Sequence, residues 1–349
     1  MKYYQAINSA QKKILQQDPD VLLLGLGVPG PTGIFGTTKG RQEEFGEERV
    51  IDTPSSENAM TGVAIGAATA GKKVIMVHMR VDFALLSIEP LVNQAAKWSY
   101  MYGGKLSAPI VIRLIVGRGW GQGPQHSQVL HSWFAHIPGL KVIAPATPAD
   151  AGGMLISAVN DKAPVLIFEH RWLYNIEEKL VEDIQSQPLE GARVVVTGIH
   201  ITFVAMSYMV LECIKAAKIL KRFNISAEVI DLRNLSNLDI ETVLISVKKT
   251  KRLIVCDIGH RQCSVASEVL ARVFTESSVR LDCPPDLIGL PQIPTPTTPA
   301  LAKHYYPDNL SIAEAALKQM KMEDHIATLE EHKTDGWNDT PDNFYFGPY

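Results

Sequence analysis

The stretch "DTPSSENAMTGVAIGAATAGKK", residues 52–73, joins a helix pattern of small residues to a single acid placed just before it. Gly62, Gly66 and Ala70 recur at a spacing of four, which puts them on one face of the expected helix. A face without bulky side chains lets another backbone approach closely. Packing within the chain and contact with a second subunit both fit this pattern. Glu57 stands at the start of the helix, where the helix dipole favours an acid.

Around this stretch, short apolar runs alternate with helical patterns. The runs are nearly continuous in hydrophobicity, as is typical of strands buried on both faces. They are "VLLLGLG" (21–27), "KKVIMVHM" (72–79), "APIVIRLIV" (108–116), "KVIAPA" (141–146) and "APVLIFEH" (163–170). Between them we expect helices in "ENAMTGVAIGAATAG", in "IEPLVNQAAKWSYMYGG" and after Thr147-Pro148, where Thr caps and Pro starts the helix. This alternation predicts an α/β fold with a mainly parallel, doubly wound sheet.

A polar stretch, residues 175–193, separates this series from a second one. Beyond it come "VVVTGIHITFVAMS", a helix through Lys221, "SAEVIDL", "ETVLISVKKT", "KRLIVCDIG" and the helix "SVASEVLARVF". We therefore predict two doubly wound α/β domains, at residues 1–180 and 190–325, followed by a C-terminal tail at 326–349. The tail is rich in aromatic residues, Asp and Gly.

Composition excludes several classes of protein. The chain is 46% hydrophobic and 20% charged, with a formal net charge of −3 and no cluster of Lys and Arg. A chain with this charge distribution has no basic surface patch of the kind that binds nucleic acid. No apolar run is long enough to cross a membrane, and the polar N-terminus does not read as a secretory signal, so we expect a cytoplasmic protein. The four cysteines have no CxxC spacing, which favours buried, reduced thiols.

The glycine-rich stretch "GRGWGQGPQHSQ", residues 117–128, superficially suggests a loop that binds phosphate. It contains no Lys-Ser/Thr pair of a P-loop and no GxGxxG that opens a helix. By spacing alone, a surface loop is the preferred interpretation.

Taken together, the motifs resemble a known family. They are "ERVIDTPSSE", the small-residue helix, "QAAKWSYMYGG", "APIVIR", "QHSQ", "HIPGLKVIAPATPADAGGML", "VIDLRNL" and "PALAKHYYPD". From about residue 2 to 325 the chain resembles the β subunit of the thiamine-diphosphate-dependent 2-oxo acid dehydrogenase E1 component. The resemblance implies a transketolase-like pyrimidine-binding domain followed by a transketolase C-terminal domain.

The resemblance gives roles to single residues. Glu57 matches the acid that bonds N1′ of the cofactor's aminopyrimidine, so that the cofactor can deprotonate its own C2. Phe83 matches the aromatic residue that stacks on this ring, although a core Phe fits the sequence equally well. His126, flanked by Gln125, matches the active-site histidine that hydrogen-bonds the substrate. His131, in contrast, has the pattern of a packing or surface residue.

The resemblance also implies a potassium site that is built mainly of backbone carbonyls. Its positions here are Ile110, Ala158, Val159, Asp161 and Ala163. An ordinary turn at the end of a helix explains the same residues.

Two departures from the family stand near the site. Arg80 and Asp82 replace apolar residues before the aromatic position, which suggests a substrate with hydroxyl or phosphate groups, unless the two side chains pair with each other. Leu26 and Gly27 replace an acidic pair, so an acidic proton path between paired sites is in question.

No GDG motif, which would hold Mg²⁺ and the diphosphate, occurs in the chain. The resemblance therefore implies an E1-α-like partner that supplies this half of the site, in an α2β2 heterotetramer that contains a β dimer. The leading prediction is decarboxylation of a 2-oxo acid, with the acyl group passed to a lipoyl-bearing acyltransferase. The alternatives are one subunit of a split transketolase, acting on an aldehyde sugar, and a non-catalytic scaffold.

Overall fold

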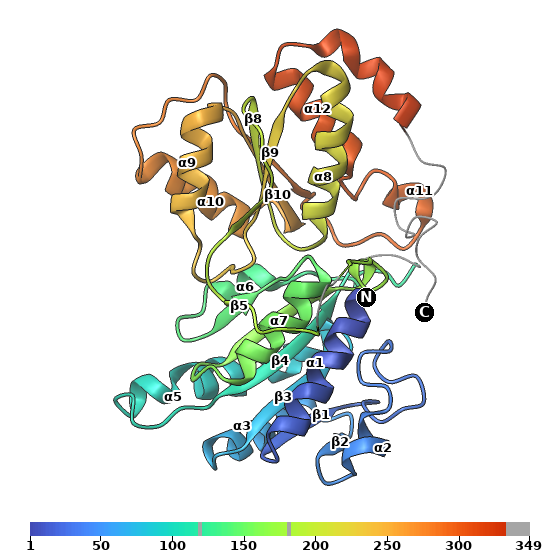
Figure 1. Cartoon of the computed structure of the whole chain (residues 1–349), viewed down its shortest axis with the longest axis vertical. Helices are drawn as coiled ribbons and strands as arrows, with labels where there is room; N and C mark the ends of the chain where they lie inside the picture. The colour runs from blue at the N-terminus through green and yellow to red at the C-terminus, as the bar shows by residue number, and fades with distance from the viewer. Residues whose placement is uncertain (118–120, 180–182, 333–349) are drawn as a thin grey trace. The chain divides into compact units, whose positions relative to one another are not determined.

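The computed structural model describes residues 1–117, 121–179 and 183–332 (Figure 1). The described chain divides into two compact units. The first unit contains residues 1–117, 133–179 and 183–189, and the second contains residues 121–132 and 190–332. From residue 333 onward the predicted tail lies outside the described residues. None of the described helices is long and apolar enough to cross a membrane.

The first unit is built on a parallel sheet of six strands in the order β2-β1-β3-β4-β6-β5. The strands are β1 (Val21–Gly25), β2 (Val50–Asp52), β3 (Lys73–His78), β4 (Ile110–Val116), β5 (Lys141–Ile143) and β6 (Val165–His170). Every residue of β4 and of β6 is buried, as the apolar runs predicted. The short strand β2 was missed, because three residues are too few for a hydrophobic pattern.

Helices cover this sheet. They are α1 (Tyr3–Gln17), α2 (Arg41–Phe45), α3 (Glu57–Thr69), α4 (Val81–Ala84), α5 (Ala96–Met101) and α7 (Pro148–Val159). The short α6 (His131–Ala135) includes the residues at which the chain passes from the second unit back to the first. The segment predicted as one helix before residue 104 is a π-helix, Pro90–Ala95, that leads into α5. The predicted start of α7 is confirmed, since the Thr147 side chain accepts a hydrogen bond from the Asp150 N–H and Pro148 opens the helix.

Helices α1 and α7 lie side by side (Figure 1). They approach closely at Gly152, where an added Cβ would lie 2.8 Å from the carbonyl oxygen of Ala6. A side chain at this position would therefore push the two helices apart.

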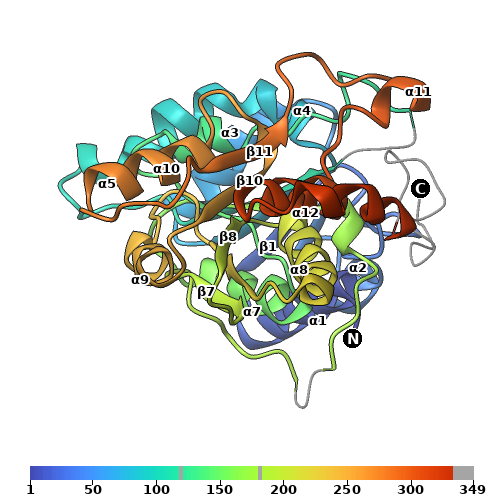
Figure 2. The same ribbon diagram turned by 90° about the horizontal axis from the view of Figure 1, so that it is seen from above.

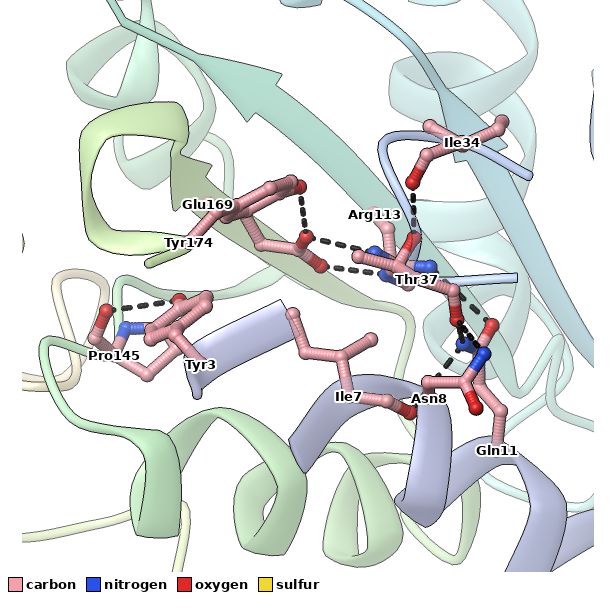
Figure 3. A network of polar contacts seen from close by, with 10 residues as sticks. All are labelled: Tyr3, Ile7, Asn8, Gln11, Ile34, Thr37, Arg113, Pro145, Glu169 and Tyr174. Carbon is pink, nitrogen blue, oxygen red and sulfur yellow. Dashed lines mark hydrogen bonds and ion pairs between the residues drawn. The ribbon is translucent and has the colours of Figure 1, made fainter. Parts of the chain in front are cut away.

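A buried polar network holds α1 to the sheet (Figure 3). Arg113 of β4 and Glu169 of β6 form a two-pronged ion pair, with Nε–Oε1 at 2.6 Å and Nη2–Oε2 at 2.8 Å. Tyr174 donates to Glu169 at 2.7 Å, and Arg113 donates to Gln11 of α1 at 3.2 Å. Because these partners satisfy the buried charges, the charges are tolerated inside the core.

The second unit contains five strands in the order β11-β10-β8-β9-β7. Its strands are β7 (Arg193–Val196), β8 (Ile201–Ala205), β9 (Ala227–Asp231), β10 (Leu253–His260) and β11 (Asp286–Leu290). The sheet is parallel except for β7, which pairs antiparallel with β9. The restart "VVVTGIHITFVAMS" thus contains two strands that belong to different places in the sheet. Two doubly wound α/β domains are confirmed.

The main helices of the second unit are α8 (Tyr208–Leu220), α9 (Ile240–Thr250), α10 (Val265–Thr275) and α12 (Asn309–Gln319), with the short α11 (Pro299–Ala302). Helices α8 and α12 lie side by side on one face of the sheet, and α9 and α10 lie on the other (Figures 1 and 2).

The four cysteines of the chain are free thiols. Cys213 and Cys256 are buried as predicted, whereas Cys263 is exposed and Cys283 is only partly buried, which corrects the expectation for these two residues.

Candidate functional site

The first sheet contains a topological switch point between β1 and β3. The chain leaves β1 to form β2 on one side and then returns to form β3 on the other side. In open parallel sheets, ligands bind outside the carboxyl ends of the strands at such a point.

A recess lies at this edge of the sheet and encloses about 20 Å³. That volume has room for about one water molecule, so the recess is one wall of a site rather than a complete ligand pocket. Its lining consists of Leu26, Thr53, Pro54, Glu57, Met76, Val77, His78, Met79 and Phe83.

Glu57 is the first residue of α3, and its main chain is anchored to the segment Leu85–Ser87. The Ser87 hydroxyl donates to the Glu57 carbonyl oxygen at 3.1 Å, and the Thr61 hydroxyl donates to Ser87 at 2.8 Å. The side chains of Thr61 and Ser87 are fully buried. These bonds hold the start of α3 at the recess, of which Glu57 is a lining residue.

Phe83 lies on α4, directly after β3, and is 36% exposed. The turn that carries it is fixed by Arg80, whose carbonyl accepts from the Phe83 N–H at 3.2 Å. The guanidinium of Arg80 donates to the carbonyl of Gly117 at 3.4 Å and is buried in this role. Arg80 and Asp82 are outside the recess lining, while Phe83 and Glu57 belong to it together.

The turn after β1 completes the recess. Gly25 has a φ of +156°, and an added Cβ would lie 2.6 Å from the carbonyl oxygen of Val77 on β3. Only glycine lets the two strand ends come this close. The N–H of Gly27 donates to the carboxylate of Asp52 at 2.7 Å, which ties the turn to the end of β2.

His126 and Gln125 belong to the second unit, where both side chains are exposed. The N–H of His126 donates to the carbonyl of Gly123 at 3.4 Å. Their roles toward a substrate stay predictions.

The sequence left open whether His131 is a packing residue or a surface residue, and in the structure it is a packing residue. Its Nε2 lies 3.0 Å from Oδ1 of Asp257, and both side chains are buried. Burial raises the pKa of Asp257, but His131 and the N–H groups of Gly259 and Ala266 outweigh this effect and hold the pKa below its usual value.

Of the proposed potassium positions, Ile110 begins β4, Ala158 and Val159 end α7, and Asp161 and Ala163 lie between α7 and β6. The carboxylate of Asp161 accepts from Lys141 Nζ at 2.6 Å and from the Ala163 N–H at 2.8 Å. Within the described ranges, no group of three or more His, Cys, Asp or Glu could hold a metal ion. A site of backbone carbonyls needs no such group of side chains, so the potassium site stays a prediction.

The small-residue face of α3 points away from the sheet. Gly62, Gly66 and Ala70 are exposed, and an added Cβ at either glycine meets no atom within 4 Å. Thr61, Ala64, Ile65 and Ala68 of the same helix are buried instead. Packing within the chain therefore does not explain these small residues.

His78 is a lining residue that the sequence reasoning missed. It ends β3 and is 4% exposed. Burial lowers the pKa of His78 to about 4, so its imidazole is neutral near pH 7. A histidine directly after the apolar run 74–77, shortly before the aromatic Phe83, was the signal available in the sequence.

Comparisons with known proteins identify the family to which the chain belongs. Residues 1–177 match the family described as transketolase, pyrimidine binding domain, and residues 190–312 match transketolase, C-terminal domain. The acetoin:2,6-dichlorophenolindophenol oxidoreductase subunit beta of Cupriavidus necator is 40% identical over 90% of this chain and 96% of that protein. The protein of the same name from Bacillus subtilis is 38% identical, over 90% and 95%.

The mitochondrial pyruvate dehydrogenase E1 component subunit beta of Bos taurus is 36% identical over 91% of this chain and 90% of that protein. The chain therefore belongs to the transketolase-like family of E1-type β subunits. A solved structure described as split gene transketolase, inactive beta4 tetramer, has a TM-score of 0.73 at 21% identity and covers 91% of this chain and 98% of that one. At this identity the likeness establishes the shared fold.

Proposed function

We propose that this chain is the β subunit of a thiamine-diphosphate-dependent enzyme of the 2-oxo acid dehydrogenase E1 type. The observation that carries the proposal is that Glu57 and Phe83 line one recess at the switch point of the sheet. An acid beside an aromatic face, with apolar Leu26, Met76 and Met79 around them, fits a neutral heteroaromatic ring that carries a basic nitrogen.

Each residue has a separate task in this proposal. Bound thiamine diphosphate supplies a nucleophilic carbon for attack on the substrate carbonyl. Glu57 holds or releases the proton at N1′ of the aminopyrimidine, and Phe83 covers the face of the ring. His126 hydrogen-bonds the substrate oxygen. Residues 110, 158, 159, 161 and 163 are the proposed carbonyl site for K⁺.

A partner of the E1-α type completes the enzyme. In this proposal the recess receives the pyrimidine end of the cofactor, and the chain has no GDG motif for Mg²⁺ and the diphosphate. We assign these to the α chain. The exposed Gly62 and Gly66 of α3, with Ala70 directly after the helix, favour a β–β contact, which together with two α chains makes an α2β2 assembly.

The acyl donor and acceptor are the finer part of the proposal. The E1 pattern implies a 2-oxo acid as donor and a lipoyl group as acceptor, whereas two relatives are named for acetoin and a dye. A split transketolase is the second candidate, because polar Arg80 and Asp82 stand shortly before Phe83 in the sequence.

Co-expression with an α-like chain from the same genome tests the function. The purified complex is assayed for reduction of 2,6-dichlorophenolindophenol with pyruvate or acetoin, and in parallel for consumption of a ketose phosphate. We expect dye reduction that requires thiamine diphosphate and is lost in Glu57→Gln, with assembly intact, because Gln contacts N1′ but transfers no proton. Ketose consumption alone would select the split transketolase. A Glu57→Gln complex with the wild-type rate would refute the role of this acid.

A further inference from the structure

His78 is a buried polar group of the recess to which the roles above assign no task. It shares the lining with Glu57 and Phe83, and its side chain is 4% exposed. Its Nε2 is buried and has no hydrogen-bond partner among the residues that the structure describes. A buried polar nitrogen without a partner costs free energy, and a ligand that supplies the partner removes that cost.

The protonation state of the His78 imidazole limits which ligand atoms can hydrogen-bond to it. Burial keeps His78 neutral near pH 7, so one ring nitrogen donates a hydrogen bond and the other accepts one. A neutral imidazole brings no positive charge to bind a phosphate group. It does match the edge of a heteroaromatic ring, on which donors and acceptors alternate.

The position of His78 limits the ligand further. It is the last residue of β3, at the carboxyl edge where the switch point places ligands. Apolar side chains make up most of the recess around it, among them those of Leu26, Met76, Val77 and Met79. Such a wall favours a flat, uncharged ring and leaves the polar recognition to few groups.

We propose that His78 is a further recognition residue of this site, which hydrogen-bonds a heteroatom of the bound pyrimidine other than the nitrogen assigned to Glu57. The inference rests on the proposed function, since that function supplies the ring. His78 then acts on the affinity and selectivity for the ring and is not required for binding of the diphosphate.

The test compares two probes on the complex with the α-like partner. Calorimetry measures the Kd of thiamine diphosphate and of the thiazole diphosphate fragment, which lacks the pyrimidine. His78→Phe removes the hydrogen bond and keeps a flat ring, whereas His78→Gln keeps a donor and an acceptor. Val74→Ala, in a buried position of β3 away from the recess, is the control for general weakening of the strand.

We expect His78→Phe to raise the Kd of thiamine diphosphate roughly tenfold and to leave the fragment unchanged, with His78→Gln recovering most of the loss. Val74→Ala should leave the ratio of the two Kd values unchanged. An unchanged ratio in His78→Phe overturns the inference, and so does an equal loss for both probes. If His78→Phe does not assemble, His78→Leu replaces it with the same criteria. A wild-type complex that binds neither probe refutes the proposed function instead.

Discussion

Acid should destabilise the first unit through His78, because this histidine is neutral when folded and gains a proton when unfolded. Its usual pKa is 6.5, and burial lowers it to about 4 in the folded chain. Between these values the unfolded state binds a proton that the folded state does not bind. The free energy of unfolding therefore falls as the pH falls below 6.5, and this loss levels off below about pH 4.

The size of the effect follows from the shift in pKa. Each unit of pKa corresponds to about 1.4 kcal/mol, so this group removes about 2.5 kcal/mol of stability between about pH 7.5 and about pH 4.5. Urea unfolding at a series of pH values measures it, with hydrogen exchange of the β3 and β4 amides to report on the first unit. His78→Phe and His78→Gln have no titrating group at this position, so both should lose this part of the pH dependence.

His136→Gln is the matched control, because it removes an exposed histidine of the same chain. It should retain the pH dependence of the wild type. The reasoning would be refuted if His78→Phe and His78→Gln kept the wild-type dependence of stability on pH, since another group would then bind the proton.

Three further substitutions test the ring face, the subunit contact and the core. Phe83→Ala should weaken binding of thiamine diphosphate to the complex by about 1–3 kcal/mol in calorimetry, and an unchanged Kd would mean that the ring only packs. Gly66→Leu puts bulk on the exposed face of α3 and should convert a β dimer to monomers in light scattering; a persistent dimer would place the contact elsewhere. Glu169→Gln leaves Arg113 buried without its counter-charge and should cost about 3–5 kcal/mol in urea unfolding. Glu276→Gln, in a surface pair, should change stability little, and equal losses in the two variants would contradict the argument from burial.

Much of the fold could be predicted from the local pattern of apolar and polar residues. The runs at 108–116 and 163–170 are apolar at nearly every position, and β4 and β6 are buried throughout, as a sheet covered on both faces requires. Strand β2 was not predicted, because three residues are too few to show the alternation of apolar and polar side chains that marks a strand. The antiparallel pairing of β7 with β9 was not predicted either, because the direction of a strand in a sheet depends on strands that are far from it in the sequence.

The candidate site was accessible only in part. Glu57 and Phe83 were found through their place in a family pattern, and the recess brings both into one lining. His78 was not found, because a histidine in an apolar strand reads as a core residue until its surroundings are known. Arg80 was taken for a substrate residue, and that role stays untested, but its guanidinium contacts the carbonyl of Gly117.

The sequence by itself determined the alternation of strands and helices and the start of α7 at Thr147-Pro148. These follow from periodicity and capping, which act over a few residues. Only the tertiary structure decided that Arg113 pairs with Glu169, 56 residues away, and that the small face of α3 points outward. It also decided that His78 lines the recess. Such outcomes depend on which surfaces are buried against each other, and burial is a property of the packed chain that no short stretch specifies.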